Sequence, residues 1–150
     1  MLATDISVAD TIENEILNVT EGFFIALKEK RFTDAWELLT AKSRDIIIDE
    51  VYTEINKTKT KIGKEIIKEE FNNNGELLDI YWNAFVKKFD PATVLEQSVW
   101  NIREIKNHSA VIFLQYKKSE YPSDLKLYKE NGKWRFGLVE SFWTRKWGVE

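Results

Sequence analysis

The sequence predicts a single soluble α+β domain over 1–150, with helices over about 8–90 and a C-terminal antiparallel sheet over about 94–143. Both prolines, Pro91 and Pro122, lie in the last third of the chain, so nothing interrupts long helices before them. After Pro91 the spacing of apolar residues changes from three or four to two, which is the period of a strand. A chain of 150 residues is also long enough to bury a core of its own.

The helices are predicted from apolar stripes. The first stripe runs from Ile12 to Leu27 with residues three or four apart. Asn72-Asn73-Asn74-Gly75 is poor helix material and indicates a turn, and Pro91 should close the last of these helices. Helical segments are therefore expected over 8–28, 32–39, 41–57, 62–71 and 77–89.

Four strands should follow, joined by short turns. The clearest turn is at Asn131-Gly132, because both residues tolerate the positive φ angles of a type I′ hairpin turn. Consecutive antiparallel pairing is the simplest topology, so we expect a meander. The expected strands are 94–105, 109–118, 124–129 and 133–143.

Alternation along these strands separates an inner face, which should meet the helices, from an outer face. The inner residues expected on the second and fourth strands are apolar with few exceptions. The whole inner set is Val94, Glu96, Ser98, Trp100, Ile102, Ala110, Ile112, Leu114, Tyr116, Trp134, Phe136, Leu138, Glu140 and Phe142.

Two carboxylates, Glu96 and Glu140, fall on this inner face. A carboxylate buried without a partner is costly, so it is usually paired, protonated or in contact with water. A shared cavity would explain both acids, and its candidate residues are Glu96, Ser98, Trp100, Tyr116, Trp134 and Glu140. The favoured alternative is that both acids lie near strand ends and reach solvent, or that a bulge turns them outward.

The outer face offers a second candidate surface. Trp143 and Trp147 are hard to bury, and with Val111, Phe113 and Val139 they would form an apolar patch typical of a partner surface. A homodimer formed sheet to sheet would be one use of this patch. The alternative is that the C-terminal tail folds back over the same face.

Composition and motifs argue against several classes of function. The chain has no cysteine, which excludes disulfides and thiolate metal sites, and its single histidine, His108, falls in a predicted turn. We therefore expect no metal, no cofactor and no Ser-His-Asp triad. Residues 1–90 carry a net charge of −6 and residues 91–150 a net charge of +3, but no basic stripe accompanies stacking aromatics, so no nucleic-acid partner is expected.

The sequence also gives an expectation about compartment. No apolar run reaches the length of a membrane span, and the first residues have neither the basic region nor the apolar region of a signal peptide. A cytoplasmic location is the default expectation. A secreted or lipid-anchored protein that had lost its leader would read the same way.

Two segments suggest a relationship to a known superfamily. Apolar residues match its opening helices at Phe24, Ala26, Leu27, Phe32, Ala35, Trp36, Leu38 and Leu39. The turn Asn131-Gly132-Lys133-Trp134 matches its last hairpin. On these residues the chain resembles the nuclear transport factor 2-like superfamily, most closely its bacterial members of unknown function.

This resemblance implies a cystatin-like cone in which a curved sheet wraps around helices and encloses a pocket, and it also implies sheet-to-sheet dimers. Residues 43–89 depart from the pattern, because they are predicted to be helical where many members insert an early β-hairpin. Enzymes of the superfamily, such as ketosteroid isomerase and the polyketide cyclases, use an acid as general base. No motif of theirs matches this chain residue by residue, so the resemblance assigns no catalytic residue.

The leading hypothesis is a non-enzymatic binding module for a small apolar ligand or a protein partner, because aromatic residues are abundant and no catalytic set is visible. A rival hypothesis is a small lyase or isomerase that uses Glu140 or Glu96 as general base in an apolar pocket. A third is a domain that dimerises or binds a partner through the outer sheet face.

Overall fold

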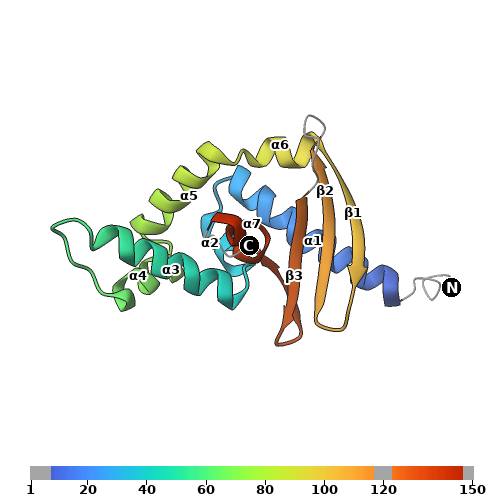
Figure 1. Ribbon diagram of the computed structural model, residues 1–150, viewed down its shortest axis with the longest axis horizontal. Helices are drawn as coiled ribbons and strands as arrows, with labels where there is room; N and C mark the ends of the chain where they lie inside the picture. The colour runs from blue at the N-terminus through green and yellow to red at the C-terminus, as the bar shows by residue number, and fades with distance from the viewer. Residues whose placement is uncertain (1–7, 117–122, 147–150) are drawn as a thin grey trace.

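The computed structural model describes residues 8–116 and 123–146 of the chain, with side chains for 11–116 and 123–142. Helices occupy the first part and an antiparallel sheet follows, as predicted (Figure 1). The elements are α1 (Val8–Lys28), α2 (Phe32–Glu37), α3 (Ala41–Ile55), α4 (Lys64–Asn72), α5 (Glu76–Lys88), α6 (Pro91–Glu96), β1 (Ser98–Ile105), β2 (Ser109–Tyr116), β3 (Ser123–Glu130), β4 (Lys133–Gly137) and α7 (Leu138–Lys146).

The sheet is the predicted meander, with the order β1-β2-β3-β4 and antiparallel pairing throughout. It is not strongly curled, and α1 crosses one of its faces (Figure 1). The hairpin turn between β3 and β4 has positive φ angles at Asn131 (52°) and Gly132 (79°), as the type I′ prediction requires. A bulge at Arg103 shifts the pairing register of β1 against β2.

The face that meets α1 is the one predicted from alternation. Ala110, Ile112 and Leu114 of β2 are buried, and so are Trp134 and Phe136 of β4. Helix α1 covers this face with aromatic side chains. The ring of Phe136 lies 4.9 Å from that of Phe23 and 5.8 Å from that of Phe24, measured between centroids. These rings fill the centre of the core.

Helices α3, α4 and α5 extend to one side of the sheet and form a helical arm (Figure 1). Ring contacts join this arm to the rest of the core. The Trp36 and Phe71 ring centroids are 4.8 Å apart, and the Phe23 and Trp82 centroids are 5.8 Å apart. The arm is thus packed on α1 and α2 through buried aromatic residues.

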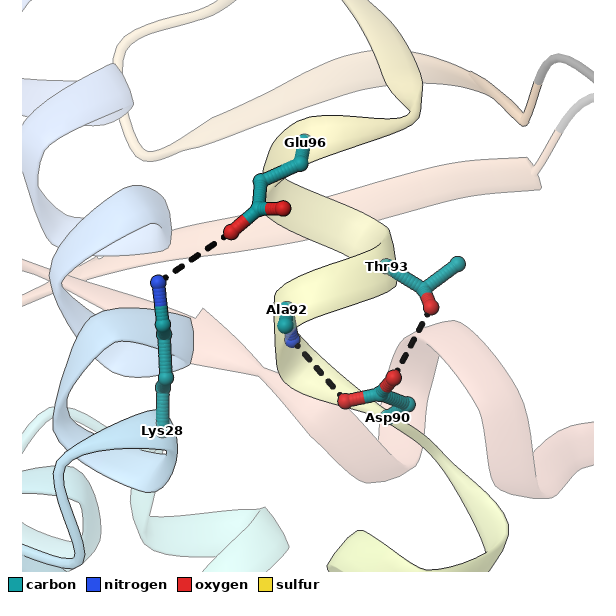
Figure 2. A network of polar contacts seen from close by, with 5 residues as sticks. All are labelled: Lys28, Asp90, Ala92, Thr93 and Glu96. Atoms are coloured by element: carbon teal, nitrogen blue, oxygen red, sulfur yellow. Dashed lines mark hydrogen bonds and ion pairs between the residues drawn. The ribbon is translucent and has the colours of Figure 1, made fainter.

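Two short helices replace the ends of predicted strands. The strand expected over 94–105 begins only at Ser98, because Pro91–Glu96 form α6. Pro91 therefore starts a helix, rather than only closing α5. Asp90 caps it by accepting hydrogen bonds from the Ala92 N–H at 3.1 Å and the Thr93 hydroxyl at 2.9 Å (Figure 2). An Asp cap followed by Pro at the first helical position favours a helix start.

The second correction concerns the strand expected over 133–143. Strand β4 ends at Gly137, and Leu138–Lys146 form α7. Leu138, Val139 and Glu140 are all buried, which a strand with one exposed face would not allow. The Val139 N–H donates to the Ser43 hydroxyl at 3.1 Å, so a side chain from α3 satisfies a free donor at the start of α7.

Candidate functional site

Glu96 lies outside the predicted pocket. It is the last residue of α6, and its side chain is 61% exposed and forms an ion pair with Lys28 of α1, with Nζ and Oε2 3.2 Å apart (Figure 2). An exposed ion pair of this kind contributes little to stability. The predicted alternative, in which this acid reaches solvent, is the arrangement observed.

Glu140 is buried, at 9% exposure, in the first turn of α7. Its two carboxylate oxygens accept hydrogen bonds from the Thr40 hydroxyl at 2.8 Å and from the Ser43 hydroxyl at 2.7 Å. Thr40 is also the N-cap of α3 and accepts from the Ser43 N–H at 3.0 Å. The three side chains and the Val139 N–H form a closed set of hydrogen bonds, which we call the hydroxyl–carboxylate cluster.

This cluster joins the N-termini of α3 and α7. A carboxylate is favoured there, because the free N–H groups of a helix start carry partial positive charge. Burial, followed by the charge of Glu140, raises the pKa of Tyr128 on the neighbouring strand β3. Because Glu140 is buried and both of its carboxylate oxygens accept hydrogen bonds from residues at the start of α3, we infer that it stabilises the position of the first turn of α7.

The other predicted pocket residues lie on three strands of the sheet, β1, β2 and β4. Ser98 pairs with Tyr116 across β1 and β2, and the Trp100 indole N–H donates to the Val94 carbonyl at 3.3 Å. Trp134 lies on β4, at the opposite edge. The Ser98 hydroxyl and the Trp134 indole N–H are buried without a hydrogen-bond partner in the part of the chain that the structure describes. Strands β2 and β3 lie between β1, which carries Ser98, and β4, which carries Trp134.

The predicted partner surface is only partly assembled. Val111 and Phe113 lie half-buried on the outer face, where an ion pair between Arg103 and Asp124, 2.9 Å apart, spans from β1 to β3. Val139 is buried in α7, at 4% exposure, instead of facing outward from a strand. The side chain of Trp143 and all of Trp147 lie outside the described residues.

A groove that the sequence did not reveal lies between α3 and α5 of the helical arm. It has a volume of about 1050 Å³. We call it the α3–α5 groove. Its apolar walls consist of Ile46, Val51, Ile55, Leu77, Ile80 and Ala84. Ile80 is 57% exposed and lies in the lining together with the other apolar residues, so the groove leaves apolar surface open to a ligand.

The polar lining of the groove comes mainly from α3 and is acidic. It consists of Asp49, Glu50, Thr53, Glu54 and Lys57, together with the Tyr81 side chain of α5. Burial and the hydrogen-bonded carboxylate of Glu50 both raise the pKa of Tyr81, so the phenol stays protonated. This hydrogen bond links the two helices that form the walls.

The remaining acids of the lining make ion pairs at the surface. Asp49 and Lys64 approach to 2.8 Å, and Glu54 and Lys57 approach to 3.1 Å. The hydrogen bond to Asp49 raises the pKa of Lys64. The Asp49 and Glu54 side chains remain 60% and 67% exposed, so they stay available to other cations.

One sequence signal for the groove was present on α5. Leu77, Ile80 and Ala84 are spaced by three and four residues, which places them on one face of a helix. The main stripe of this helix packs on the core through Leu78 and Trp82, so the helix carries a second apolar face. A second apolar face on one helix indicates another contact surface.

No protein family, no curated protein and no solved structure matches this chain. Within residues 8–116 and 123–146, no three His, Cys, Asp or Glu side chains are grouped so as to hold a metal ion. None of the described helices combines the length and the apolar character needed to cross a membrane.

Proposed function

We propose that the protein is a binding module and that the α3–α5 groove is its ligand site. One observation carries this proposal: an apolar groove of about 1050 Å³ that leaves Ile80 57% exposed. Ligand sites are typically concave and largely apolar, with a few polar groups that orient the ligand. The acids of α3 and the Tyr81–Glu50 pair supply such groups here.

This proposal moves the ligand site from the sheet to the helical arm. Phe23 and Phe24 of α1 pack against the inner sheet face at Phe136, where a ligand inside a cone would have to lie. The rival enzymatic hypothesis gains no support from its two acids. Glu96 is exposed in an ion pair, and both oxygens of Glu140 already accept hydrogen bonds.

Distant membership of the nuclear transport factor 2-like superfamily belongs to the same proposal. It is supported by the order of the elements, with helices first and a meander last, and by α1 lying across the sheet (Figure 1). The weak curl of the sheet and the site on the helical arm would set this chain apart from a cone with an internal pocket.

Binding of a neutral, environment-sensitive apolar dye to the full chain tests the proposed site. The chain offers a matched pair of variants, since Ile80 lines the groove at 57% exposure and Ile66 lies outside the lining at 56%. We expect Ile80→Ser to weaken dye binding about tenfold, because burying an aliphatic side chain is worth roughly 1.5–3 kcal/mol and only part of it contacts the dye. Ile66→Ser should leave the affinity unchanged.

Circular dichroism of both variants checks that the helices remain. Equal weakening by the two substitutions, or no dye binding by the wild type, would overturn the proposal.

A second candidate, a homodimer formed through the outer sheet face, is favoured by Val99, which is 50% exposed on β1. Sedimentation of the wild type and of Val99→Asp tests it, with a shift to monomer expected only if that face is the interface.

A further inference from the structure

We propose that the occupant of the α3–α5 groove is a basic amphipathic helix of a partner protein. This inference rests on the proposed function and narrows it to one class of ligand. It is carried by the shape of the groove, by the spacing of apolar residues along its walls and by the sign of the charges on one side.

The shape of the groove suits a helix. The lining residues run from Ile46 to Ile55 on α3 and from Leu77 to Ala84 on α5, so the walls are roughly 11–14 Å long at 1.5 Å per residue. Leu77, Ile80 and Ala84 line one wall at helical spacing, and Ile46 belongs to the other. An amphipathic helix lays apolar residues at i, i+3, i+4 and i+7 into such a groove. At 5.4 Å per turn, about two to two and a half turns of helix would span these walls.

The charges select a cationic occupant. Asp49, Glu50 and Glu54 line the groove together with Lys57, and Lys64 of α4 pairs with Asp49, so three acids face two cations at this wall. The ion pairs of Asp49 and Glu54 are exposed, and pairs of this kind contribute only about 0–1 kcal/mol, so a ligand can exchange partners with them at little cost. A fatty acid or another anionic amphiphile would meet repulsion at this wall.

A second copy of this chain fits less well. Two concave surfaces cannot fill one another, whereas a helix is convex. A two-fold interface would also bring identical acidic walls together, and like charges at close range oppose association. A helix with Lys or Arg along one flank and large aliphatic residues on the adjacent face has both the convex shape that the groove requires and the positive charge that the acidic wall favours.

The test uses two labelled peptides of about 14 residues with identical aliphatic residues at i, i+3, i+4 and i+7. One carries Lys and Arg on its flank, and the other carries Glu at the same positions. Anisotropy with the full chain should show that the basic peptide binds at least about tenfold more tightly at low salt, with the difference shrinking as salt screens the charges. Bound basic peptide should gain helical circular dichroism and displace the neutral dye.

Charge variants locate the contact. Asp49→Asn with Glu54→Gln should weaken binding of the basic peptide about fivefold to tenfold, and should weaken binding of the neutral dye by a smaller factor because the dye carries no charge. The control is Glu65→Gln with Glu69→Gln, which removes two exposed charges from α4 outside the lining and should change affinity by less than about twofold. An equal loss in both double variants would overturn the assignment of the acidic wall.

Other outcomes separate this inference from the proposed function. If the dye binds but the two peptides bind equally or not at all, the basic helix is wrong and the binding module stands. Displacement of dye by a single-chain alkylammonium compound, with neither peptide bound, would indicate a small cationic ligand and likewise overturn the helix. Absence of both dye and peptide binding would overturn the proposed function itself.

Discussion

Among the residues that the structure describes, Glu140 is a buried carboxylate whose hydrogen-bond partners include no lysine or arginine. Hydroxyl donors from Thr40 and Ser43 satisfy one oxygen each, at 2.8 Å and 2.7 Å. The same hydroxyls accept from the N–H groups of Ser43 and Val139, so each is both a donor and an acceptor. Removing the carboxylate would leave two buried hydroxyls without an acceptor.

We expect Glu140→Ala to lower the free energy of unfolding by about 2–4 kcal/mol, because each unsatisfied buried polar group costs about 1–3 kcal/mol. Glu140→Gln should cost less, since the amide keeps one acceptor oxygen. Denaturant titration followed by circular dichroism measures both. Glu96→Gln is the control and should cost no more than about 1 kcal/mol. A Glu140→Ala chain as stable as the wild type would show that the cluster does not hold α7 in place.

The sequence marked Glu140 as unusual, but it placed the residue on a strand, favoured contact with solvent and named no partner, whereas Glu140 is buried in α7. Flanking apolar residues placed this acid on an inner face, and it is buried. Its two hydroxyl donors, however, are 100 and 97 positions away in the chain. No local pattern predicts contacts between residues so far apart in the chain. A carboxylate in a structural hydrogen-bond cluster and a carboxylate in a ligand pocket therefore give the same sequence pattern. Glu96 had the same pattern and is exposed.

Among the elements, the junction between β4 and α7 depends on a glycine. A Cβ built on Gly137 would lie 3.0 Å from the Lys126 carbonyl oxygen and 3.0 Å from the Glu140 carboxyl carbon. The carbonyl belongs to the neighbouring strand β3, where Lys126 pairs with Gly137, so it has little freedom to move. The strand can pass this close to α7 only because residue 137 lacks a side chain.

Gly137→Ala and Gly22→Ala should therefore change stability in opposite directions. We expect Gly137→Ala to lower the free energy of unfolding by about 1–3 kcal/mol through crowding. Gly22 lies inside α1, where a Cβ would meet only Leu38 Cδ1 at an ordinary 3.7 Å. Alanine there should raise stability by about 0.5–1 kcal/mol, because it favours the helix. Thermal melts of the two variants give the comparison, and a shift of the same sign in both would contradict it.

Long elements were predictable, and short capped helices were not. The bounds of α1 and the meander agree with the apolar periods of the sequence. Helix α6 did have a local signal, since Asp90-Pro91 is a favourable helix start. At the start of α7 the Val139 N–H donates to the Ser43 hydroxyl of another helix, while the apolar spacing of Leu138 and Phe142 around Glu140 resembles the alternation of a strand. Only the fold could distinguish these two readings.

At the scale of the whole molecule, the α3–α5 groove depends on how two helices are placed. The apolar residues of each wall are visible in the sequence. The space between the walls depends on how α3 and α5, which are connected through α4, are placed relative to one another (Figure 1). The apolar stripes that were read correctly describe the core. The groove is lined partly by residues of the predicted stripes, such as Val51 and Leu77, and partly by residues outside them, such as Ile46 and Ile80. No period along one helix predicts which helix lies beside it.

Phe23 lies where the helical arm meets the sheet. Its ring centroid is 5.8 Å from that of Trp82 in α5 and 4.9 Å from that of Phe136 in β4, and its side chain is fully buried. Because Phe23 contacts both the helical arm and the sheet, a substitution that weakens its packing should destabilise both. The sequence predicts one domain, and this contact is a physical reason for the arm and the sheet to unfold together.

We expect Phe23→Leu to lower the free energy of unfolding by about 1–3 kcal/mol while preserving a single transition. Amide hydrogen exchange should then show the same loss of protection at Trp82 and Phe136, because both amides open through the same global event. Val99→Ala, at a half-exposed position of β1, is the control and should leave both amides nearly unchanged. If the arm lost protection while the sheet kept it, the groove would belong to a separately unfolding unit, and a ligand that stabilised the arm would leave the sheet's stability unchanged.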